Sequence, residues 1–492
     1  MEKKPFFITT AIDYPSAKVH IGHAFEKIQA DVIARYKRLQ GFDVHFSVGT
    51  DEHGLKIQRY AQKAGKSPQN FVDEMSGYFK ELWSELSISN DDFIRTTESR
   101  HIKVVKEIIE KIYEKGDIYK GKYRGLYCVD CETYYLPKDL ENGNCPIHQK
   151  PAETIEEETY FFKMSGYQKQ LVEYIQKNKD FIIPESRKNE ILSRLKEPLQ
   201  DLSITRKAVE WGIPFPIDEK LTIFVWVEAL INYFTTIDYP NDKFKKFWPA
   251  DIHIIGKDIL WHHSVIWGSL LMSLELPLPK TIFVHGYVTS GGQKMSKSLG
   301  NVVDPFELIE TYTQKIGSKE AAIDAVRYFL LREISPTQDG DFTTEKFENR
   351  YNSDLAKGLG NLTSRIIALA LRTGPEVPIS RLGHKGQEFL GEIKKQYKEN
   401  LDNLEFGKAL ENVWQLISFC DKYIDRKKPW EREESDHVIS NLLILLAEIA
   451  GMLIPFLPGT SKLIFKQLGI KDFSKEHSMI IIEKGEPLFP RL

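Results

Sequence analysis

The hydrophobic and polar positions near the amino terminus follow two different patterns, a continuous apolar run and then a spacing of three to four residues. Residues 6–12 form a continuous run of aromatic, β-branched and small side chains, which predicts a strand. Apolar residues then recur every three or four positions from 24 to 39, which predicts a helix, and residues 44–48 predict a second strand. This order predicts a βαβ unit of a parallel sheet, which binds ligands at the carboxyl ends of its strands.

The same alternation of elements returns much later in the chain. Residues 251–255 and 281–284 predict strands, and the pattern from 259 to 274 predicts a helix between them. The economical interpretation is an α/β fold in which one Rossmann-like parallel sheet is split by an insertion. The inserted residues, 116–224, contain shorter apolar runs and more turn residues, which predicts a small domain. After residue 345 long amphipathic patterns follow without strands, which predicts an α-helical bundle.

Length and composition limit the class of protein. Of 492 residues, 41% are hydrophobic, 28% are charged and only four are Cys, which excludes a collagen-like, disordered or disulfide-stapled chain. At about 100–200 residues per domain, this length suggests about three or four compact units. Lys and Arg (67) nearly balance Asp and Glu (70), and the net charge of −3 gives no support to a general polyanion-binding role. Contacts with nucleic acid must then come from local basic clusters, such as residues 115–124 or 426–428.

The apolar segments predict neither secretion nor a membrane partner. The amino-terminal run is too short and too rich in Thr for a signal peptide, and no transit-peptide pattern is present. The most apolar stretch, residues 442–457, is interrupted by Glu448 and Gly451 and is too short to cross a bilayer. Three of the four Cys crowd into one stretch, unlike a secreted disulfide framework. We therefore expect a cytoplasmic protein.

The first candidate site lies at the turn between the first strand and its helix, where the chain reads His20-Ile21-Gly22-His23. Two imidazoles beside a helix amino terminus can donate hydrogen bonds to phosphate oxygens, helped by the unpaired backbone N–H groups. Gly22 has no Cβ and lets the backbone approach a flat purine. Taken alone, this four-residue pattern also fits polar surface or a pair of metal ligands.

The second candidate site is Gln293-Lys294-Met295-Ser296-Lys297-Ser298, which follows Gly291-Gly292. Two lysines three residues apart in a Gly- and Ser-rich loop form a cationic clamp, which can neutralise the charge that builds up as pyrophosphate leaves a triphosphate. A solvated basic loop is the simpler alternative. Together, however, the two segments resemble the HIGH and KMSKS signatures of class I aminoacyl-tRNA synthetases, in the expected order on the expected sheet.

The third candidate is a metal site in the insertion. Cys128-x2-Cys131 and, thirteen residues further on, Cys145-x2-His148 supply three thiolates and one imidazole. This closed tetrahedral set is typical of a structural Zn²⁺ rather than a catalytic one. The fold class predicted is therefore α/β, with a Rossmann-like parallel sheet split by a zinc-containing insertion and followed by an α-helical bundle.

With this set of three cysteines and one histidine, the whole chain resembles the methionyl-tRNA synthetases of the short type with one zinc per chain. The resemblance implies a methionine-tRNA ligase that forms methionyl-adenylate from L-methionine and Mg²⁺-bound ATP and then acylates methionine tRNA, both initiator and elongator. It also implies a monomer. The expected segments are a catalytic sheet (1–115 and 225–280), the connective insertion (116–224), a stem-contact region bearing KMSKS (281–345) and an anticodon-binding domain (346–492).

The resemblance also implies roles for individual residues. His20, His23, Lys294 and Lys297 are the expected catalytic residues, and with Gly22, Gly256 and Asp258 they are expected to bind ATP. The expected methionine site has Asp51 as the partner of the ammonium group, together with Ala11, Ile12, Tyr14, Trp226, Ala229, Leu230, Tyr233, Ile259, His263 and Trp267. Asn361, Arg365 and Trp430 are expected to read the anticodon. Ser16 departs from the family, in which many relatives have Asn near the phosphate loop.

Other functions remain open from the residues alone. Leucyl, isoleucyl and valyl enzymes carry an editing insertion that is larger than the one expected here, and cysteinyl enzymes have a Cys before the HIGH segment. A small-molecule nucleotidyltransferase shares a histidine-rich phosphate loop but does not need the helical bundle. A non-catalytic RNA-binding protein held together by zinc is the third alternative. Aromatic residues at helical spacing are also compatible with an ordinary core, with Trp430 packed between helices and Arg365 on the solvated surface.

Overall fold

The computed structural model describes residues 3–129, 133–135, 139–147, 149–207, 209–295, 300–380, 382–431, 436–472 and 478–492. The chain divides into two compact units. Unit 1 comprises Met1–Val19, Gly41–Leu82 and Asn90–His285, and unit 2 comprises His20–Gln40, Trp83–Ser89 and Gly286–Leu492. These are fewer units than the length suggests. The predicted insertion belongs to unit 1, where it contributes a strand to the main sheet, and the first helix belongs to the same unit as the bundle.

A six-stranded parallel sheet forms the centre of unit 1. Its order is β3 (Asp92–Arg95), β2 (Asp43–Thr50), β1 (Pro5–Thr10), β11 (Ile252–Gly256), β12 (Thr281–His285) and β7 (Ile182–Ile183). Every neighbouring pair is parallel, and Thr9 of β1 lies opposite His253 of β11. The predicted split sheet is therefore confirmed. Its strands are buried along almost their whole length, as expected for a parallel sheet covered on both faces.

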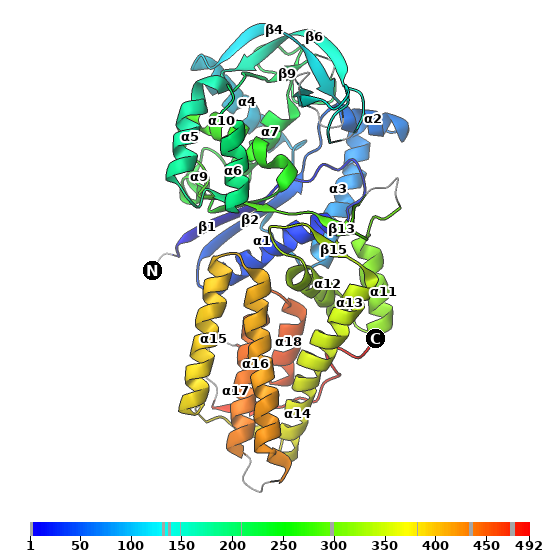
Figure 1. Ribbon diagram of the computed structural model, residues 1–492, viewed down its shortest axis with the longest axis vertical. Coiled ribbons are helices and arrows are strands. Elements are labelled where there is room, and N and C mark those ends of the chain that lie inside the picture. The colour runs from blue at the N-terminus through cyan, green and yellow to red at the C-terminus, as the bar shows by residue number, and fades with distance from the viewer. Residues whose placement is uncertain are drawn as a thin grey trace. The chain divides into compact units, whose positions relative to one another are not determined.

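The insertion is less separate from this sheet than its sequence suggests. Its two-residue strand β7 pairs with β12, at the edge of the main sheet. The rest builds an antiparallel sheet in the order β5 (Thr133–Tyr135), β4 (Ile118–Cys128), β6 (Glu153–Phe162) and β8 (Leu202–Ser203). The long β4 and β6 ribbon is the most prominent part of this sheet (Figure 1). The insertion also contributes α5 (Gln168–Lys177), α6 (Glu185–Arg194) and the short strands β9 (Thr205–Arg206) and β10 (Thr222–Ile223).

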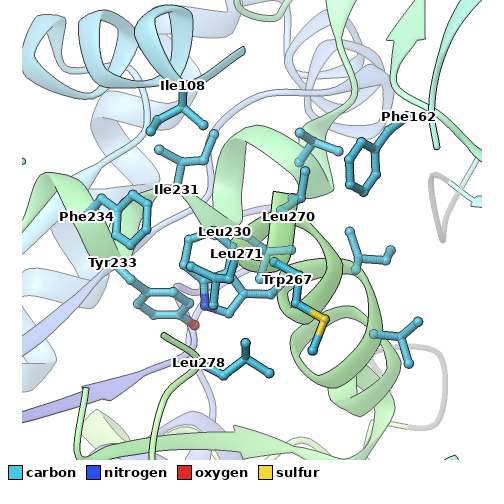
Figure 2. Packing of buried hydrophobic residues seen from close by; sticks show 14 of the residues in the cluster. Ile108, Phe162, Leu230, Ile231, Tyr233, Phe234, Trp267, Leu270, Leu271 and Leu278 are labelled. Carbon is cyan, nitrogen blue, oxygen red and sulfur yellow. The ribbon is translucent and has the colours of Figure 1, made fainter. Parts of the chain in front are cut away.

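Helices of unit 1 bury a large apolar core, part of which Figure 2 shows. Ile108 and Phe234 are almost completely buried there, as are Trp267 and Leu271. The helices that supply this core are α4 (Ser99–Glu114), α7 (Val225–Leu230), α8 (Asn232–Thr235) and α10 (Trp267–Ser273). Unit 1 also contains α2 (Leu55–Lys63), most of α3 (Pro68–Glu85) and α9 (Asp242–Phe247). The apolar spacing that predicted these helices is the spacing of residues that face the core.

Unit 2 begins with α1 (Ile21–Leu39) and contains the sheet β14 (Gln293–Lys294), β13 (Val288–Ser290) and β15 (Gly340–Phe342). Two helices, α11 (Pro305–Ile316) and α12 (Lys319–Glu333), precede the predicted bundle, which is confirmed. The bundle consists of α13 (Thr344–Arg350), the π-helix η6 (Tyr351–Gly360), α14 (Asn361–Thr373), α15 (His384–Asp402), α16 (Phe406–Lys427), α17 (Asp436–Leu453) and α18 (Pro458–Gln467). The long helices α15 and α16 run side by side (Figure 1). Strands β16 (Glu376–Pro378) and β17 (Met479–Ile481) form a small ribbon.

One helix in the described ranges, α17, is long and apolar enough to cross a membrane by length and composition. Two thirds of it (67%) is buried, and it packs against α14, α16 and α18. Contacts of this kind are those of a core helix in a bundle, which was the interpretation drawn from the sequence.

Candidate active site

The two histidines of the HIGH segment form the amino-terminal cap of α1. The backbone N–H of Gly22 donates to Nδ1 of His20 (3.1 Å), and the backbone N–H of His20 donates to Nδ1 of His23 (3.1 Å). The ring centroids are 3.9 Å apart. These bonds satisfy N–H groups at the helix start, a role that Ser, Thr or Asp usually fills.

This capping also determines which ring nitrogen carries the proton. Because Nδ1 of each ring accepts an N–H, the proton of the neutral imidazole must be on Nε2. Burial and, secondarily, the ammonium of Lys294 lower the pKa of His20 to about 4. At neutral pH His20 is therefore an uncharged ring whose Nε2–H is a hydrogen-bond donor, as recognition of a phosphate oxygen requires.

Lys294 lies on the hairpin formed by β13 and β14. Gly291 and Gly292 turn this hairpin with φ angles of 61° and 75°, which glycine adopts most readily. The backbone N–H of Gly292 donates to Asp341 (2.7 Å), and the ammonium of Lys294 lies 4.9 Å from the ring centroid of Tyr287. Lys297, the second expected lysine, lies outside the described residues.

The HIGH and KMSKS segments come together within unit 2. The charge of Lys294 acts on the ring of His20, and a Cβ added to Gly22 would lie 3.9 Å from Cε of Met295. The backbone N–H of Ile21 also donates to the carbonyl of Val303 (3.1 Å), just beyond the KMSKS loop. Two segments nearly three hundred residues apart in sequence thus place imidazole donors beside an ammonium group.

The loop after β2, with the sequence Gly49-Thr-Asp-Glu-His-Gly54, carries the expected partner of the substrate's ammonium group. Asp51 is buried (5% exposed), and its backbone N–H donates to the carbonyl of Asp13 (2.8 Å). The hydroxyl of Tyr14, another expected pocket residue, donates to the carbonyl of His53 (3.0 Å). Ala11 and Ile12 follow β1, and the N–H of Ala11 donates to Ile254 in β11. These contacts bring Tyr14 and Asp51 to the carboxyl end of the sheet, where ligands bind in open parallel sheets.

The expected thioether wall is formed by α7, α8 and the π-helical turn η4 (His262–Ile266). Trp226 stacks on His262 with centroids 3.8 Å apart. His263 Nδ1 lies 3.0 Å from the carbonyl of Ile259, which can only accept, so this nitrogen carries the proton. Nε2 of His263 must then accept the hydroxyl hydrogen of Tyr233, at 2.7 Å. This hydroxyl hydrogen is therefore directed at His263.

The other wall residues belong to the apolar core of unit 1. Ala229, Leu230 and Trp267 are 5%, 2% and 0% exposed, and Figure 2 shows Leu230 and Trp267 among the packed residues. The two interpretations of the aromatic spacing, core and pocket, are therefore compatible, since one side chain can serve both. Their methionine contacts remain predictions.

Gly256 and Asp258 lie at the carboxyl end of β11, where the family resemblance places the nucleotide. A Cβ on Gly256 would be 2.7 Å from Oδ1 of Asp258 and 3.7 Å from the ring of His285. A side chain at position 256 would therefore displace the carboxylate of Asp258 from its present position. Asp258 is exposed at the surface of unit 1. Ser16, where the chain departs from the family, donates its backbone N–H to the carbonyl of Tyr14 (2.8 Å).

Of the four expected zinc ligands, the described residues include two. Cys128 ends β4 and Cys145 lies in a tight turn, and both thiols are buried (2% and 0% exposed). The turn is closed by hydrogen bonds from Cys145 to Lys150 and from Gln149 back to Cys145, both 2.8 Å. Cys131 and His148 lie outside the described residues. Among the residues that are described, no group of three or more metal-binding side chains is present.

In unit 2 two of the expected anticodon residues, Asn361 and Arg365, lie on α14, and the third, Trp430, lies in a short turn after α16. Arg365 of α14 donates to Asp421 (2.9 Å) and Asp425 (2.8 Å), two carboxylates one turn apart on α16. Asn361 at the start of α14 is exposed, and Trp430 is 47% exposed in the short 3₁₀ turn Pro429–Glu431. Trp430 is therefore not packed between helices, and Arg365 is oriented by ion pairs rather than simply solvated.

Sequence reasoning missed two buried carboxylates beside the expected methionine site. Glu52, next to Asp51, accepts from Arg95 (2.7 and 2.9 Å), Ser76 (2.6 Å) and Thr97 (2.6 Å). Glu228 on α7 lies between two histidines. For Glu228 the sequence signal is a charged residue inside an apolar stretch, and such a residue must be paired when it is buried. Glu52 lies among polar residues and gives no such signal.

Two protein families match this chain. The family described as "tRNA synthetases class I (M)" matches residues 6–149 and 130–367, and the "Anticodon-binding domain of tRNA ligase" matches residues 388–485. Among curated proteins, a methionine–tRNA ligase of Caldanaerobacter subterraneus subsp. tengcongensis is 44% identical over 520 residues, covering 100% of this chain and 79% of that protein. One of Thermotoga maritima is 43% identical, covering 99% of this chain and 80% of that protein.

Solved structures agree over the full length. The Mycobacterium tuberculosis methionyl-tRNA synthetase in complex with methionyl-adenylate superposes with a TM-score of 0.92 and 35% identity, covering 99% of this chain and 100% of that one. The apo form of the Mycobacterium tuberculosis protein has a TM-score of 0.85 and 32% identity, covering 100% and 99%.

Proposed function

Because the chain belongs to the class I methionyl-tRNA synthetase family, we propose that it ligates L-methionine to methionine tRNA in two steps. In the first step a carboxylate oxygen of methionine attacks the α-phosphorus of ATP, and pyrophosphate leaves. In the second step the terminal ribose hydroxyl of the tRNA attacks the acyl carbonyl of methionyl-adenylate, and AMP leaves. The tRNA partners are the initiator and elongator methionine tRNAs.

The first step needs positioning and charge stabilisation but no enzyme nucleophile, because the attacking carboxylate is already ionised. His20 and His23 would donate through Nε2–H to phosphate oxygens, while Lys294 and Lys297 neutralise the charge of the departing pyrophosphate. Mg²⁺ would enter with ATP and help to neutralise the charge of its phosphates. Gly256 and Asp258 would accommodate the adenosine. The approach of the HIGH segment to the chain on both sides of the KMSKS loop, at Met295 and at Val303, is the observation that carries this proposal.

Recognition of methionine would divide between a charged and an apolar part of unit 1. The buried Asp51 would pair with the ammonium group in a partly dry site. The aromatic wall would select the thioether by shape and S···aromatic contacts, since the Tyr233 hydroxyl hydrogen is taken up by His263. Such pockets discriminate by only about 1–3 kcal/mol per methylene, so close analogues of methionine should be activated weakly rather than excluded.

The insertion would hold one structural Zn²⁺. The donor chemistry fits, because Cys128 at the end of β4 and Cys145 in a tight turn are both buried thiols. Cys131 and His148 would complete the ligand set. When bound, the ion would stabilise the fold of the insertion and would take no part in the reaction.

The bundle would read the anticodon. An exposed Trp430 offers a stacking surface for an unstacked base, and Asn361 and the ion-paired Arg365 offer hydrogen bonds to a base edge. The five-segment division of the chain, a monomeric state and a cytoplasmic location belong to the same proposal. The family resemblance supports them.

The decisive experiment is ATP–pyrophosphate exchange measured with each amino acid singly. Exchange that depends on methionine supports the proposal, and exchange with leucine instead would move the chain to another synthetase family. A complete lack of amino-acid-dependent exchange would favour a non-catalytic RNA-binding module. Exchange that depends on another small molecule instead of an amino acid would favour a nucleotidyltransferase.

A further inference from the structure

The two parts of the expected methionine site are carried by elements far apart in the sequence. Asp51 is on the loop after β2, whereas Trp226, Ala229 and Leu230 are on α7. A site that recognises both the ammonium group and the side chain of one amino acid needs a fixed spacing between these two parts, because a small misplacement weakens both interactions. A rigid connection between the loop and α7 is therefore a requirement of selective binding.

Glu228 provides this connection. It lies on α7 between Trp226 and Ala229 and is completely buried (0% exposed). One of its carboxylate oxygens is 2.9 Å from Nδ1 of His53, on the loop that carries Asp51. Its other oxygen is 3.1 Å from Nε2 of His101 on α4, whose Nδ1 lies 3.0 Å from the hydroxyl of Thr235. A buried carboxylate thus joins three elements of unit 1.

The proton positions follow from the acceptor. Burial alone raises the pKa of the Glu228 carboxyl, but the two imidazoles outweigh it and hold that pKa below its usual value. An ionised carboxylate only accepts, so Nδ1 of His53 and Nε2 of His101 both donate. Thr235 can then donate its hydroxyl hydrogen to Nδ1 of His101. The Thr235 hydroxyl also lies 3.4 Å from the carbonyl of Ile231, so the carboxylate, the two imidazoles and α8 belong to one continuous hydrogen-bonded network.

Three further residues, Trp211, Tyr14 and Arg95, donate hydrogen bonds to the loop. The indole N–H of Trp211 donates to the carbonyl of Glu52 (2.6 Å), and the hydroxyl of Tyr14 donates to the carbonyl of His53 (3.0 Å). The side chain of Glu52 is bound by Arg95. These contacts orient the loop itself, and the bond from His53 to Glu228 connects it to α7.

We propose that Glu228 is a positioning residue that sets the distance between the ammonium partner Asp51 and the thioether wall on α7, and thereby selects the length of the amino-acid side chain. The inference rests on the proposed function. Glu228 acts through His53 and does not itself touch the substrate. Loss of the connection should relax the spacing, weaken methionine binding and reduce discrimination against side chains one methylene shorter or longer.

The test compares His53→Ala with His53→Asn in the full-length protein. The amide nitrogen of Asn can take the place of Nδ1 as the donor to Glu228, whereas Ala removes it. Pyrophosphate exchange is measured with methionine, with S-methylcysteine as the shorter probe and with ethionine as the longer one. We expect His53→Ala to raise KM for methionine about tenfold, the ratio expected for one lost hydrogen bond to a charged group, with KM for ATP unchanged.

The selectivity ratios should move with KM. In His53→Ala the preference for methionine over S-methylcysteine and ethionine should fall several-fold, and His53→Asn should stay close to the wild type in both respects. A second pair, His101→Ala and His101→Gln, tests the other side of the carboxylate in the same way, because the Gln amide nitrogen takes the place of Nε2. This pair also decides the matter if His53→Ala fails to fold.

Asp324→Asn is the matched control. Asp324 is also a fully buried carboxylate, but it accepts the backbone N–H of Thr460 at the start of α18 in unit 2. Its substitution should lower the melting temperature without changing KM for methionine or the selectivity ratios. Unchanged KM and ratios in both alanine variants, or equal damage by Ala and its conservative partner, would overturn the inference. A wild-type protein without methionine-dependent exchange would instead refute the proposed function.

Discussion

The guanidinium of Arg327 is a buried cation with four hydrogen-bond partners in unit 2, and its removal should strongly destabilise the protein. It is completely buried and donates to the carboxylate of Asp31 (2.7 Å) and to the carbonyls of Phe456 (2.8 Å), Pro455 (3.0 Å) and Leu86 (3.1 Å). It therefore connects α12, which carries it, to α1 with the HIGH histidines, to the chain after α3 and to the turn before α18.

The expected loss follows from what Arg327→Leu leaves behind. Asp31 stays buried with only Arg35 and Ser89 as partners, and the three carbonyls lose their donor. Removing one member of a buried ion pair costs about 3–5 kcal/mol, because the remaining charge is uncompensated. We expect a loss of this size in the free energy of unfolding, measured by urea titration with far-UV circular dichroism. The double variant Asp31→Asn/Arg327→Leu should recover part of it, since no buried charge remains.

The pH dependence gives a second readout. Burial alone raises the pKa of Asp31, but Arg327, Arg35 and Ser89 outweigh it and the pKa is lowered. In the wild type this carboxylate therefore stabilises the fold above its unfolded pKa, and the contribution is lost as pH falls through the folded pKa. Without Arg327 the pKa of Asp31 should rise, so the deficit of Arg327→Leu should shrink on acidification to about pH 5. Equal losses in the single and double variants, at both pH values, would refute the reasoning.

Four further outcomes test the site. His20→Asn keeps an acceptor for the Gly22 N–H but has no donor at the position of Nε2. The melting temperature should therefore stay nearly unchanged, while adenylate formation in single-turnover assays should become slower by a factor of about 10²–10³. Because the pKa of His20 is lowered to about 4, the wild-type exchange rate should show no loss from its protonation between pH 8 and about pH 5. Cys145→Ser should reduce the zinc content measured by atomic absorption and expose the insertion to proteolysis, with little change elsewhere. Trp430→Ala should reduce kcat/KM for tRNA by a factor that corresponds to about 1–3 kcal/mol of lost stacking energy, while leaving pyrophosphate exchange intact.

Local patterns predicted the elements of the fold well. Continuous apolar runs located β1, β2, β11 and β12, the three- to four-residue spacing located α1, and the turn between β1 and α1 placed the HIGH histidines near a helix start. Lys294 was expected in a Gly- and Ser-rich loop, and in the structure Gly291 and Gly292 turn a hairpin whose second strand carries it. Such features depend on residues a few positions apart, so the sequence contains the information directly.

Contacts between residues far apart in the sequence could not be predicted from these local patterns. Strand β7 has only two residues, Ile182 and Ile183, and nothing in that pattern indicates that it joins the main sheet. The bonds from Glu228 to His53 and His101 span 175 and 127 residues, and the ion pair of Arg327 with Asp31 spans 296. A charged residue in an apolar helix predicts that some partner exists, but only the packing of the elements determines which one.

The choice of histidine at positions 20 and 23 shows why the cap of α1 and the chemistry of the site depend on the same rings. Asp or Ser, the usual capping residues, would also accept the helix N–H groups. Asp would then place a negative charge where a triphosphate must bind, and Ser offers a single oxygen to both tasks. An imidazole accepts at Nδ1 and donates at Nε2, and burial keeps His20 uncharged. The ring can therefore complete the helix and present an N–H to an anion at the same time, without needing to change its protonation state when the anion leaves.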